Sequence, residues 1–264
     1  SVPALMELGL LHQQQNQWDR ARACFERVQT VQPDNPQILD AIGHTWQAQH
    51  QFDQAISHWQ RAVEIKPNYA EVWQNLGLAH EHRDDLPEAI ACHQKAAALR
   101  PEQSKAHRLL GAAQLDYGLL PSAEKCFDRA IELAPEDSEA IWQRFFLRAL
   151  TADFPGAWAD YECRFQLPGR TTPDPQFGQP RWNGEPLPSQ TLLLRAEQGF
   201  GDTLQMIRYA PRAAERAGRI LLWAPEPLRT LLATARGVDE VVTAKPAETD
   251  FAAHLPLMSL PGLF

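Results

Sequence analysis

The residues best suited to chemistry in this sequence form a short segment with two glycines, Arg195-Ala196-Glu197-Gln198-Gly199-Phe200-Gly201-Asp202-Thr203. Gly199 and Gly201 allow the backbone to turn sharply and approach a ligand closely, and amides at a following helix start attract an anion such as a diphosphate. Asp202 supplies a carboxylate that could accept a proton from a hydroxyl group. Asp202 with Gln205 also fits a helix N-cap with its capping box, which would explain both residues without any substrate.

The neighbouring sequence predicts that this segment joins a strand to a helix. The apolar run Thr191-Leu192-Leu193-Leu194 precedes it, and an amphipathic stretch from Leu204 to Ala217 follows. Strand and helix patterns then alternate, which is typical of a parallel α/β sheet. The predicted strands are 191–195, 219–224 and 239–243, and the predicted helices are 202–217 and 226–235. A third glycine is missing from the turn, so we reject a dinucleotide-binding dehydrogenase.

The composition indicates a globular, acidic chain without a nucleic-acid surface. The 264 residues are 44% hydrophobic, which suffices for one large domain or two ordinary ones. The formal net charge is −8, and residues 191–264 hold eight basic and eight acidic residues, so residues 1–190 carry the excess. A nucleic-acid partner is therefore not expected. No apolar run has the length of a membrane span and the N-terminus lacks a signal-peptide pattern, so we expect a cytoplasmic protein with no membrane partner.

A period of 34 residues runs through the N-terminal part of the chain. Four kinds of residue recur: a glycine, an alanine, a large side chain in the second helix, and a proline after it. They are Gly9, Gly43, Gly77 and Gly111; Ala21, Ala55, Ala89 and Ala123; Phe25, Trp59, His93 and Phe127; Pro33, Pro67, Pro101 and Pro135. The glycine lets the two helices of one repeat approach closely, and the proline ends the second helix. The period and residue types resemble the tetratricopeptide repeat, with four copies over residues 2–137.

A divergent fifth unit, residues 138–166, follows the four repeats. It keeps Ala157 and Tyr161 at matching positions but carries Arg144 and Phe145 where an apolar residue and a glycine belong. The last repeat of a stack must present a different outer face, so we interpret this unit as a cap. The predicted fold is therefore mainly α: a tetratricopeptide α-solenoid over residues 1–166, followed by a partial Rossmann-like α/β domain.

Stacked repeats of this kind place their first helices along a concave groove suited to an extended polypeptide. The repeat register directs eight side chains toward it: Asp40, His44, Gln47, Gln74, Glu81, Arg108, Asp116 and Trp142. The set lacks the basic and asparagine residues with which chaperone-binding members of the family hold a C-terminal carboxylate. It also lacks the asparagine ladder of O-linked N-acetylglucosamine transferases, with only Asn75 at a comparable place. We expect a protein or peptide partner, the alternative being an ordinary solvated helical face.

The cysteines are interpreted as packing residues. Cys24, Cys92 and Cys126 occupy one repeat position, which His58 fills in the second repeat. Because packed helices lie about 8–10 Å apart and each repeat contributes two helices, equivalent side chains cannot converge on one ion. We therefore expect no metal site, and free cysteines agree with a reducing compartment.

Residues 167–190 are rich in proline and are predicted to form a linker or wrapping loop. The prolines are Pro168, Pro173, Pro175, Pro180, Pro186 and Pro188. Phe177, Trp182 and Gly184 are expected to fix this loop to the protein, because isolated large apolar residues in a polar stretch seek a packed environment.

Several motifs along the whole chain resemble bacterial tetratricopeptide proteins with a C-terminal glycosyltransferase-like region. The motifs are the repeats, Gly156-Ala157-Trp158 to Tyr161-Glu162-Cys163-Arg164, Trp182-Asn183-Gly184, residues 192–208 and His254-Leu255-Pro256-Leu257. Gly201-Asp202 after a strand resembles the corresponding turn of ADP-heptose heptosyltransferases, which have the two-domain GT-B fold. The resemblance implies that Asp202 acts as a general base. It further implies that Gly199 and Gly201 leave room for a diphosphate or acceptor, that Gln198 orients a hydroxyl group, and that His254 lines the cleft.

Residues 191–264 are too few for one complete half of such an enzyme. We therefore expect a truncated relative that lacks the nucleotide-binding half, binds no cofactor and is inactive alone, with a nucleotide-sugar donor implied only for a longer parent. The predicted function is binding of a polypeptide in the groove and its presentation to the glycosyltransferase-like domain. The alternative is a non-catalytic scaffold whose α/β part is structural. An unfinished parallel sheet has an open edge, so self-association through residues 191–264 is also predicted.

Overall fold

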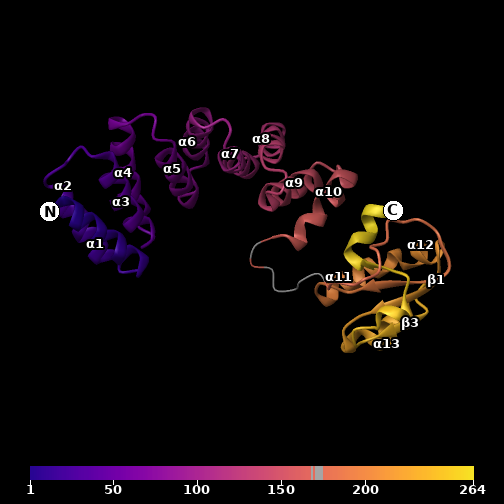
Figure 1. Cartoon of the computed structure of the whole chain (residues 1–264). Helices are drawn as coiled ribbons and strands as arrows, with labels where there is room; N and C mark the ends of the chain where they lie inside the picture. Colours follow the sequence, from indigo (N-terminus) through magenta and orange to yellow (C-terminus); the bar gives the residue numbers. More distant parts are fainter. Residues whose placement is uncertain (168, 170–174) are drawn as a thin grey trace. The chain divides into compact units, whose positions relative to one another are not determined.

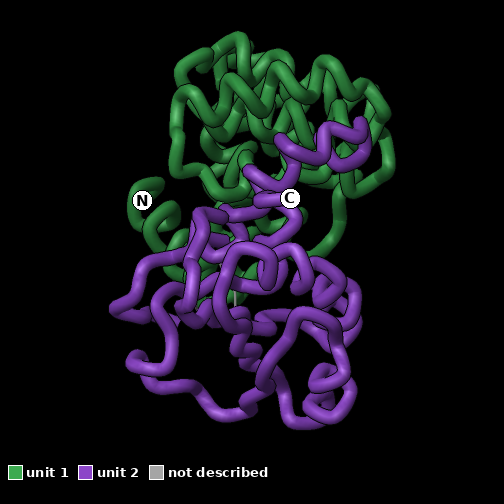
Figure 2. The backbone as a smooth tube through the Cα atoms, turned by 90° about the vertical axis from the view of Figure 1, so that its right-hand side faces the viewer, with its two compact units in different colours: residues 1–147 green, residues 148–264 purple. Residues whose placement is uncertain are grey.

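The chain folds into two compact units, residues 1–147 and residues 148–264, which Figure 2 shows in different colours. The computed structural model describes residues 1–167, 169 and 175–264. Pro168 and Pro173 of the predicted linker therefore lie outside the described residues. The units divide inside helix α9 (Ser138–Leu150), upstream of the domain boundary predicted after residue 166. None of the helices in the described ranges combines the length and apolar character needed to cross a lipid bilayer.

The first unit consists of helical hairpins that follow one another along the chain (Figure 1). The hairpins are α1 (Val2–Gln14) with α2 (Trp18–Gln29), α3 (Pro36–Gln47) with α4 (Phe52–Ile65), α5 (Ala70–His82) with α6 (Leu86–Leu99), and α7 (Ser104–Asp116) with α8 (Leu120–Leu133). The second helix of a hairpin also packs against the first helix of the next hairpin, as α2 does against α3, α4 against α5 and α6 against α7. The result is a helical solenoid in which the first helices of the hairpins occupy equivalent positions.

The glycine positions and the large side chains contact each other within each hairpin, as predicted. A Cβ atom added at Gly43 would lie 2.5 Å from Nε1 of Trp59, and one added at Gly77 would lie 2.3 Å from Cε1 of His93. Such distances are far below van der Waals contact, so only glycine allows this approach of the helices. Gly9 with Phe25 and Gly111 with Phe127 repeat the arrangement.

The turn inside each hairpin has a fixed geometry that the fifth hairpin shares. One residue per turn has a positive φ angle, and these residues are Asn16, His50, Asp84, Gly118 and Ala152. Asparagine, aspartate and glycine tolerate this left-handed region, whereas alanine does not favour it. The same positive φ angle recurs at Ala152, between α9 and α10 (Phe154–Tyr161).

The second unit contains a four-stranded parallel sheet in the order β3-β2-β1-β4. The strands are β1 (Leu187–Arg195), β2 (Ala217–Trp223), β3 (Glu240–Val242) and β4 (Ala253–Pro256). The predicted parallel sheet is confirmed, and β1 begins four residues earlier than the apolar run at Thr191 indicated. Strand β4 was not predicted. Its partner is β1, with Leu193 opposite His254.

The helices of this unit are shorter than the sequence indicated. The predicted helix 202–217 is divided into α11 (Phe200–Met206), a 3-10 turn (Ile207–Tyr209) and α12 (Ala210–Ala214). Pro211 lacks the amide hydrogen that a continuous helix requires, which explains the break. The predicted helix 226–235 is likewise a 3-10 turn (Glu226–Leu228) followed by α13 (Arg229–Leu232).

Residues of the predicted linker extend the sheet beyond β4. Arg181 forms a parallel bridge with His254, whose amide donates to the carbonyl of Pro180 at 3.1 Å. The amide of Trp182 donates to the carbonyl of His254 at 2.9 Å. Phe177 packs against the core around Leu193, so the expected fixing of this segment by Phe177 and Trp182 is confirmed. The bridge at Arg181 thus lies along the β4 edge, while β3 is the other edge strand of the sheet, and self-association through this unit stays a prediction.

Candidate functional site

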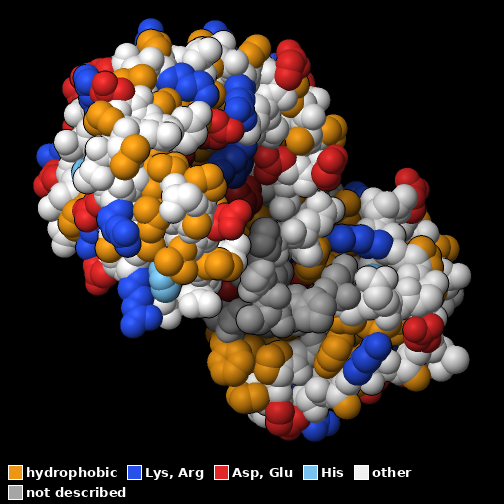
Figure 3. Space-filling model, turned by 60° about the vertical axis from the view of Figure 1, so that its left-hand side comes forward, with side chains coloured by type: hydrophobic (Ala, Val, Ile, Leu, Met, Phe, Trp, Pro, Cys, Tyr) orange, Lys and Arg blue, Asp and Glu red, His pale blue; other side chains and the backbone are white. Residues whose placement is uncertain are grey.

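The eight predicted groove residues lie on the first helices of the hairpins. Asp40, His44 and Gln47 are on α3, Gln74 and Glu81 on α5, Arg108 and Asp116 on α7, and Trp142 on α9. Gln74 is buried, Asp116 is exposed, and the others are partly exposed. Figure 3 shows acidic and basic side chains interspersed with hydrophobic ones on one face of the molecule.

Asp40 joins three helices through its carboxylate. Its Oδ1 accepts hydrogen bonds from Nε1 of Trp59 at 2.9 Å and Nδ2 of Asn75 at 3.2 Å, and its Oδ2 accepts from the hydroxyl of Tyr69 at 3.2 Å. Burial and the nearby charge of Asp40 raise the pKa of Tyr69 to about 12. His44 lies 3.2 Å from the Asn75 amide through Nε2. The Asp40 carboxylate is therefore already used to join consecutive repeats.

Two further groove residues are bonded to the next hairpin. The amide of Gln74 donates to the side-chain oxygen of Gln103 at 3.1 Å. Arg108 forms an ion pair with Glu139, with 2.8 Å between Nη2 and Oε2. These contacts hold neighbouring first helices in register and leave little free hydrogen-bonding capacity for a ligand.

Glu81 and Asp116 form an acidic pair whose charges no lysine or arginine of the described residues compensates. Glu81 bonds only to the ring of His93, with 3.0 Å between Oε1 and Nε2. Asp116 makes no hydrogen bond within the described ranges, and partial burial followed by the charge of Glu81 raises its pKa. The side chain of Gln47 likewise has no hydrogen-bond partner among them. The face near α5 and α7 thus offers a cation the carboxylate of Asp116 and the second carboxylate oxygen of Glu81.

Trp142 belongs to an aromatic cluster on α9. Its ring stacks on Phe145 with centroids 5.0 Å apart and meets Phe146 edge-on at 5.1 Å. Phe146 is 48% exposed. Phe145 and Phe146 were not predicted as binding residues, although their spacing from Trp142 places the three rings on neighbouring parts of one helix surface.

The glycine-containing turn follows β1 and enters α11, as predicted. Gly199 is the N-cap of α11 with an extended backbone, and Asp202 lies inside the first helical turn. The predicted Asp202 N-cap and its capping box with Gln205 are therefore wrong. Gly199 has no side chain that could accept a capping hydrogen bond. The hydroxyl of Thr203 instead donates to the carbonyl of Gly199 at 3.1 Å. Asp202 is partly exposed and makes no hydrogen bond in the described part of the chain.

The residues just before the turn are bound to α10 and the following 3-10 turn (Glu162–Phe165). The Gln198 amide donates to the hydroxyl of Tyr161 at 3.0 Å. Glu197 accepts from Nη2 and Nε of Arg164 at 2.6 and 3.1 Å. Gln198, which the resemblance assigned to a substrate hydroxyl, thus uses its amide hydrogen within the unit. The roles of Arg164 and Glu197 were not foreseen from the sequence.

Arg164 and Glu197 belong to a buried ionic cluster. Their side chains are 0% and 1% exposed, and Arg195 is 2% exposed. Arg195 approaches Glu197 to 3.8 Å, and the hydroxyl of Ser259 accepts from Nη2 of Arg164 at 2.7 Å. The guanidinium of Arg164 also lies 4.1 Å from the centre of the Phe165 ring. Charges taken out of water are stable only when paired and hydrogen-bonded, so this cluster fixes the position where β1 ends.

His254 lies on β4, away from the turn residues. It is 7% exposed, and its ring contacts Phe177 with centroids 4.8 Å apart. Burial, followed by the positive charges of Arg195 and Arg181, lowers the pKa of His254. No hydrogen bond or ring contact links it to Gln198, Gly199, Gly201 or Asp202 among the described residues. The structure thus keeps the four turn residues together and places His254 on β4, against the rings of Phe177 and Phe251 and near the charges of Arg195 and Arg181.

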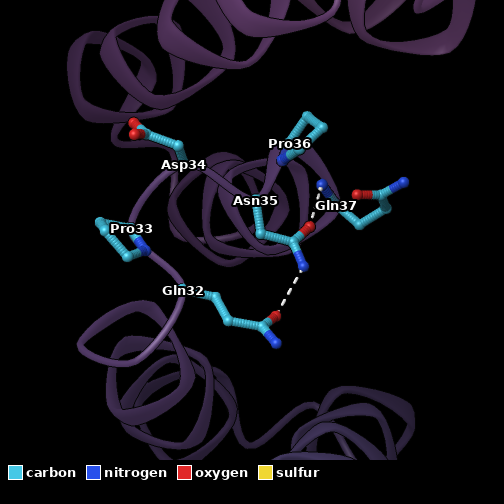
Figure 4. A pocket seen from close by; sticks show the side chains of 6 residues that line it. All are labelled: Gln32, Pro33, Asp34, Asn35, Pro36 and Gln37. Atoms are coloured by element: carbon cyan, nitrogen blue, oxygen red, sulfur yellow. Dashed lines mark hydrogen bonds between the residues drawn. The ribbon is translucent and has the colours of Figure 1, made fainter.

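A surface hollow of about 510 Å³ lies at the loop between α2 and α3, and its polar groups serve the helix start (Figure 4). Oδ1 of Asn35 accepts from the amide of Gln37 at 3.0 Å, and Nδ2 of Asn35 donates to Gln32 at 2.8 Å. These are the bonds of an asparagine N-cap. The hollow is therefore explained by the local structure of the loop.

Two sequence families match parts of the first unit. The family model described as tetratricopeptide repeat matches residues 2–35. A second family model, described as TPR repeat, matches residues 48–82. The first matched segment covers the hairpin of α1 and α2, and the second covers α4 and α5, which are the second helix of one hairpin and the first helix of the next. A search of curated proteins finds no match to this chain.

Several solved structures share the helical fold at low sequence identity. The crystal structure of MamA is 21% identical, with a TM-score of 0.56 over 59% of this chain and 91% of that chain. PilF from Pseudomonas aeruginosa is 19% identical, with a TM-score of 0.58 over 64% of this chain and 78% of that chain. YrrB, described as a TPR protein with an unusual peptide-binding site, is 15% identical, with a TM-score of 0.55 over 63% and 86% of the two chains.

Proposed function

We propose that the tetratricopeptide repeats of this chain bind a segment of another polypeptide along the face formed by α3, α5 and α7. The repeats build a solenoid whose first helices occupy equivalent positions, which suits an extended ligand. YrrB, which has this helical fold, is described as having an unusual peptide-binding site. Hydrogen bonds between repeats, such as that of Gln74 to Gln103, keep the face rigid and so lower the entropy lost on binding.

The observation that carries this proposal is the uncompensated acidic pair Glu81 and Asp116. Burial is the first cause of the raised pKa of Asp116, and the charge of Glu81 is the second, so the two carboxylates interact and a cation near both would be favoured. A lysine or arginine of the ligand would supply charge-assisted hydrogen bonds to both. The preferred ligand is therefore an extended segment with basic side chains.

Fluorescence anisotropy with short labelled peptides tests this function. A lysine-alanine peptide is expected to bind, whereas glutamate-alanine and glutamine-alanine peptides are expected not to bind. The double variant Glu81→Gln/Asp116→Asn should weaken lysine-peptide binding by roughly tenfold or more, since each charge-assisted bond contributes about 1.5–3 kcal/mol. Glu124→Gln, at an exposed position on α8, serves as the control and should bind like the unsubstituted protein. Equal losses in the control and the double variant would refute groove binding.

For the α/β unit we propose a part in glycosyl transfer from a nucleotide sugar, with Asp202 as the general base. What supports it is the strand order β3-β2-β1-β4, in which β1 lies between β2 and β4. The crossover direction reverses at β1, and ligands of open Rossmann-like sheets bind where such a reversal meets the carboxyl ends of the strands. The turn with Gly199 and Asp202 follows the carboxyl end of β1. Asp202 is partly exposed and has a free carboxylate there.

Sugar transfer from labelled nucleotide sugars to polypeptide acceptors, measured on the protein as its gene encodes it, separates this proposal from a scaffold. Asp202→Asn should abolish transfer and leave peptide binding by the repeats unchanged. Asp250→Asn, also in the second unit but outside the turn, is the matched control. Unchanged transfer in the Asp202→Asn variant would show that Asp202 is not the general base. If the unsubstituted protein transfers no sugar, the alternative of a non-catalytic scaffold is favoured.

A further inference from the structure

A cavity of about 500 Å³ lies among α4, α5 and α6, on a different face of the repeats from the proposed groove. Trp73, Leu76 and His80 line it from α5. With 3.6 residues per helical turn, these three share a helix face that lies roughly 120° around the helix axis from the face of Gln74 and Glu81. The cavity is therefore distinct from the site to which the proposed function refers.

The floor of the cavity is apolar and lacks a free strong donor. Val63, Leu76 and Cys92 are buried there. Nε1 of Trp73 already donates to the carbonyl of Pro67 at 2.9 Å, so the indole offers its ring surface rather than its hydrogen. Burial raises the pKa of Cys92 to about 11, which keeps the thiol neutral. An occupant must consequently bring apolar surface and its own donors.

His80 presents an acceptor to the same cavity. Its residue exposure is 7%, and Nδ1 lies 3.1 Å from Oδ2 of Asp85. A carboxylate only accepts, so Nδ1 carries the hydrogen in the neutral ring and Nε2 keeps its lone pair. Nε2 has no hydrogen-bond partner among residues 1–167, 169 and 175–264. Nε2 is thus an accessible acceptor on a nearly buried side chain that lines the cavity.

Carboxylates form the outer part of the cavity. Glu64 on α4 and Glu88 on α6 both line it and are exposed. Glu64 also pairs with Arg61 at 3.0 Å, which leaves its second oxygen available. The corresponding positions one repeat later carry Ala98 and Ser122, and Lys125 stands where this cavity has Ala91. The two glutamates, Glu64 and Glu88, are therefore a feature of this cavity, because the repeat pattern does not require acidic residues at their positions.

We propose that this cavity is a second docking site that holds an arginine side chain of a partner polypeptide. The aliphatic part of arginine would cover Val63 and Leu76, and its planar guanidinium would stack on Trp73. The guanidinium has five donors and no acceptor, which matches Nε2 of His80 and the carboxylates of Glu64 and Glu88. Lysine has the charge but not the planar group, so arginine is the preferred occupant.

Nuclear magnetic resonance titration with short peptides tests the site. The probes are a glycine-alanine peptide with one central arginine and the same peptide with citrulline, which keeps the shape but loses the charge. The arginine peptide should shift the indole signal of Trp73 and the ring signals of His80, and citrulline should weaken binding by roughly tenfold. The double variant Glu64→Gln/Glu88→Gln should weaken arginine-peptide binding by a similar factor.

Glu132→Gln is the matched control, because Glu132 holds the repeat position of Glu64 and pairs with Arg129 as Glu64 pairs with Arg61. It should leave arginine-peptide binding unchanged, as should the groove variant Glu81→Gln/Asp116→Asn. The proposal is overturned if the arginine peptide does not bind, if citrulline binds equally well, or if Glu132→Gln causes the same loss. A loss only in the groove variant would assign the peptide to the groove instead.

Discussion

Gly43 and Gly201 serve opposite purposes, and alanine should reveal the difference. A methyl group at Gly43 would lie 2.5 Å from the Trp59 ring, which is 0% exposed and held by its bond to Asp40. We expect Gly43→Ala to lower the free energy of unfolding by about 2 kcal/mol, within the usual cost of overpacking. Gly201 lies in α11 with no atom within 4 Å of the added carbon. Gly201→Ala should raise stability by up to ~1 kcal/mol through helix propensity.

Urea denaturation followed by circular dichroism measures both effects. The comparison is informative because the same chemical change is made in a crowded helix contact and in an open helix position. Similar changes in both variants would show that contact with Trp59 does not determine the requirement for glycine at residue 43.

His254 should make the second unit less stable in mild acid. Its pKa in the folded chain is lowered by burial and by Arg195 and Arg181, whereas an unfolded histidine keeps a pKa near 6.5. The unfolded chain therefore binds more protons below that value, and the free energy of unfolding falls as the pH drops from 6.5 toward the folded pKa. His254→Phe should reduce this pH dependence, because phenylalanine suits the rings of Phe177 and Phe251.

Urea midpoints at pH 7.5 and 5.5 test the role of His254. The control is His58→Gln, which changes a histidine on α4 that bonds to the carbonyl of Gln54. The His58→Gln variant should show the same difference in urea midpoint between pH 7.5 and 5.5 as the unsubstituted protein. An unchanged pH difference in His254→Phe would assign the acid sensitivity to other groups.

The 3-10 turn after α10 and the strand β1 are connected by the buried pair of Arg164 and Glu197. Removing Arg164 leaves a carboxylate with 1% exposure whose remaining ionic partner among the described residues is Arg195, at 3.8 Å. We expect Arg164→Leu to destabilise the second unit by about 3 kcal/mol or more, as for other broken buried pairs. Arg219→Leu removes an exposed pair with Glu240 and should cost at most about 1 kcal/mol. Equal losses would mean that burial of the pair has no special effect.

The repeats could be predicted because each of their signals reports a contact within one hairpin. Gly43 and Trp59 are 16 positions apart and touch, and the same spacing recurs in the other hairpins. The chain direction and the helix pairing then follow from spacing alone. The N-cap of α11 was predicted wrongly as Asp202. An aspartate is favoured both at the N-cap and in the first turn of a helix, so the local sequence does not distinguish the two positions.

The second unit was less predictable because its contacts join distant segments. Strand β4 has four residues, ends at Pro256 and shows no alternation, so only its pairing with β1 identifies it. The bridge between Arg181 and His254 likewise links the proline-rich segment to the sheet. Arg164 and Glu197 are 33 positions apart, and no spacing rule connects them. A buried pair of opposite charges is recognised only after the chain has folded.

At the scale of the whole molecule, two separate cores stabilise the chain. The first unit buries Phe25, Trp59 and Phe127 between paired helices. The second buries Leu193 and Leu221 in its sheet. Helical repeats contact mainly their sequence neighbours, whereas the sheet depends on distant pairs. The two units should therefore respond differently to heat, denaturant and substitution.

We expect two unfolding transitions in differential scanning calorimetry. Gly43→Ala should lower only the transition of residues 1–147, and Arg164→Leu only that of residues 148–264, because each change affects one core. For units of this size, 1 kcal/mol corresponds to about 3 °C, so shifts of several degrees are expected. The double variant should show both shifts with no extra loss, since changes at independent sites add. A single transition that both variants lower equally would mean that the repeats and the sheet unfold as one cooperative structure.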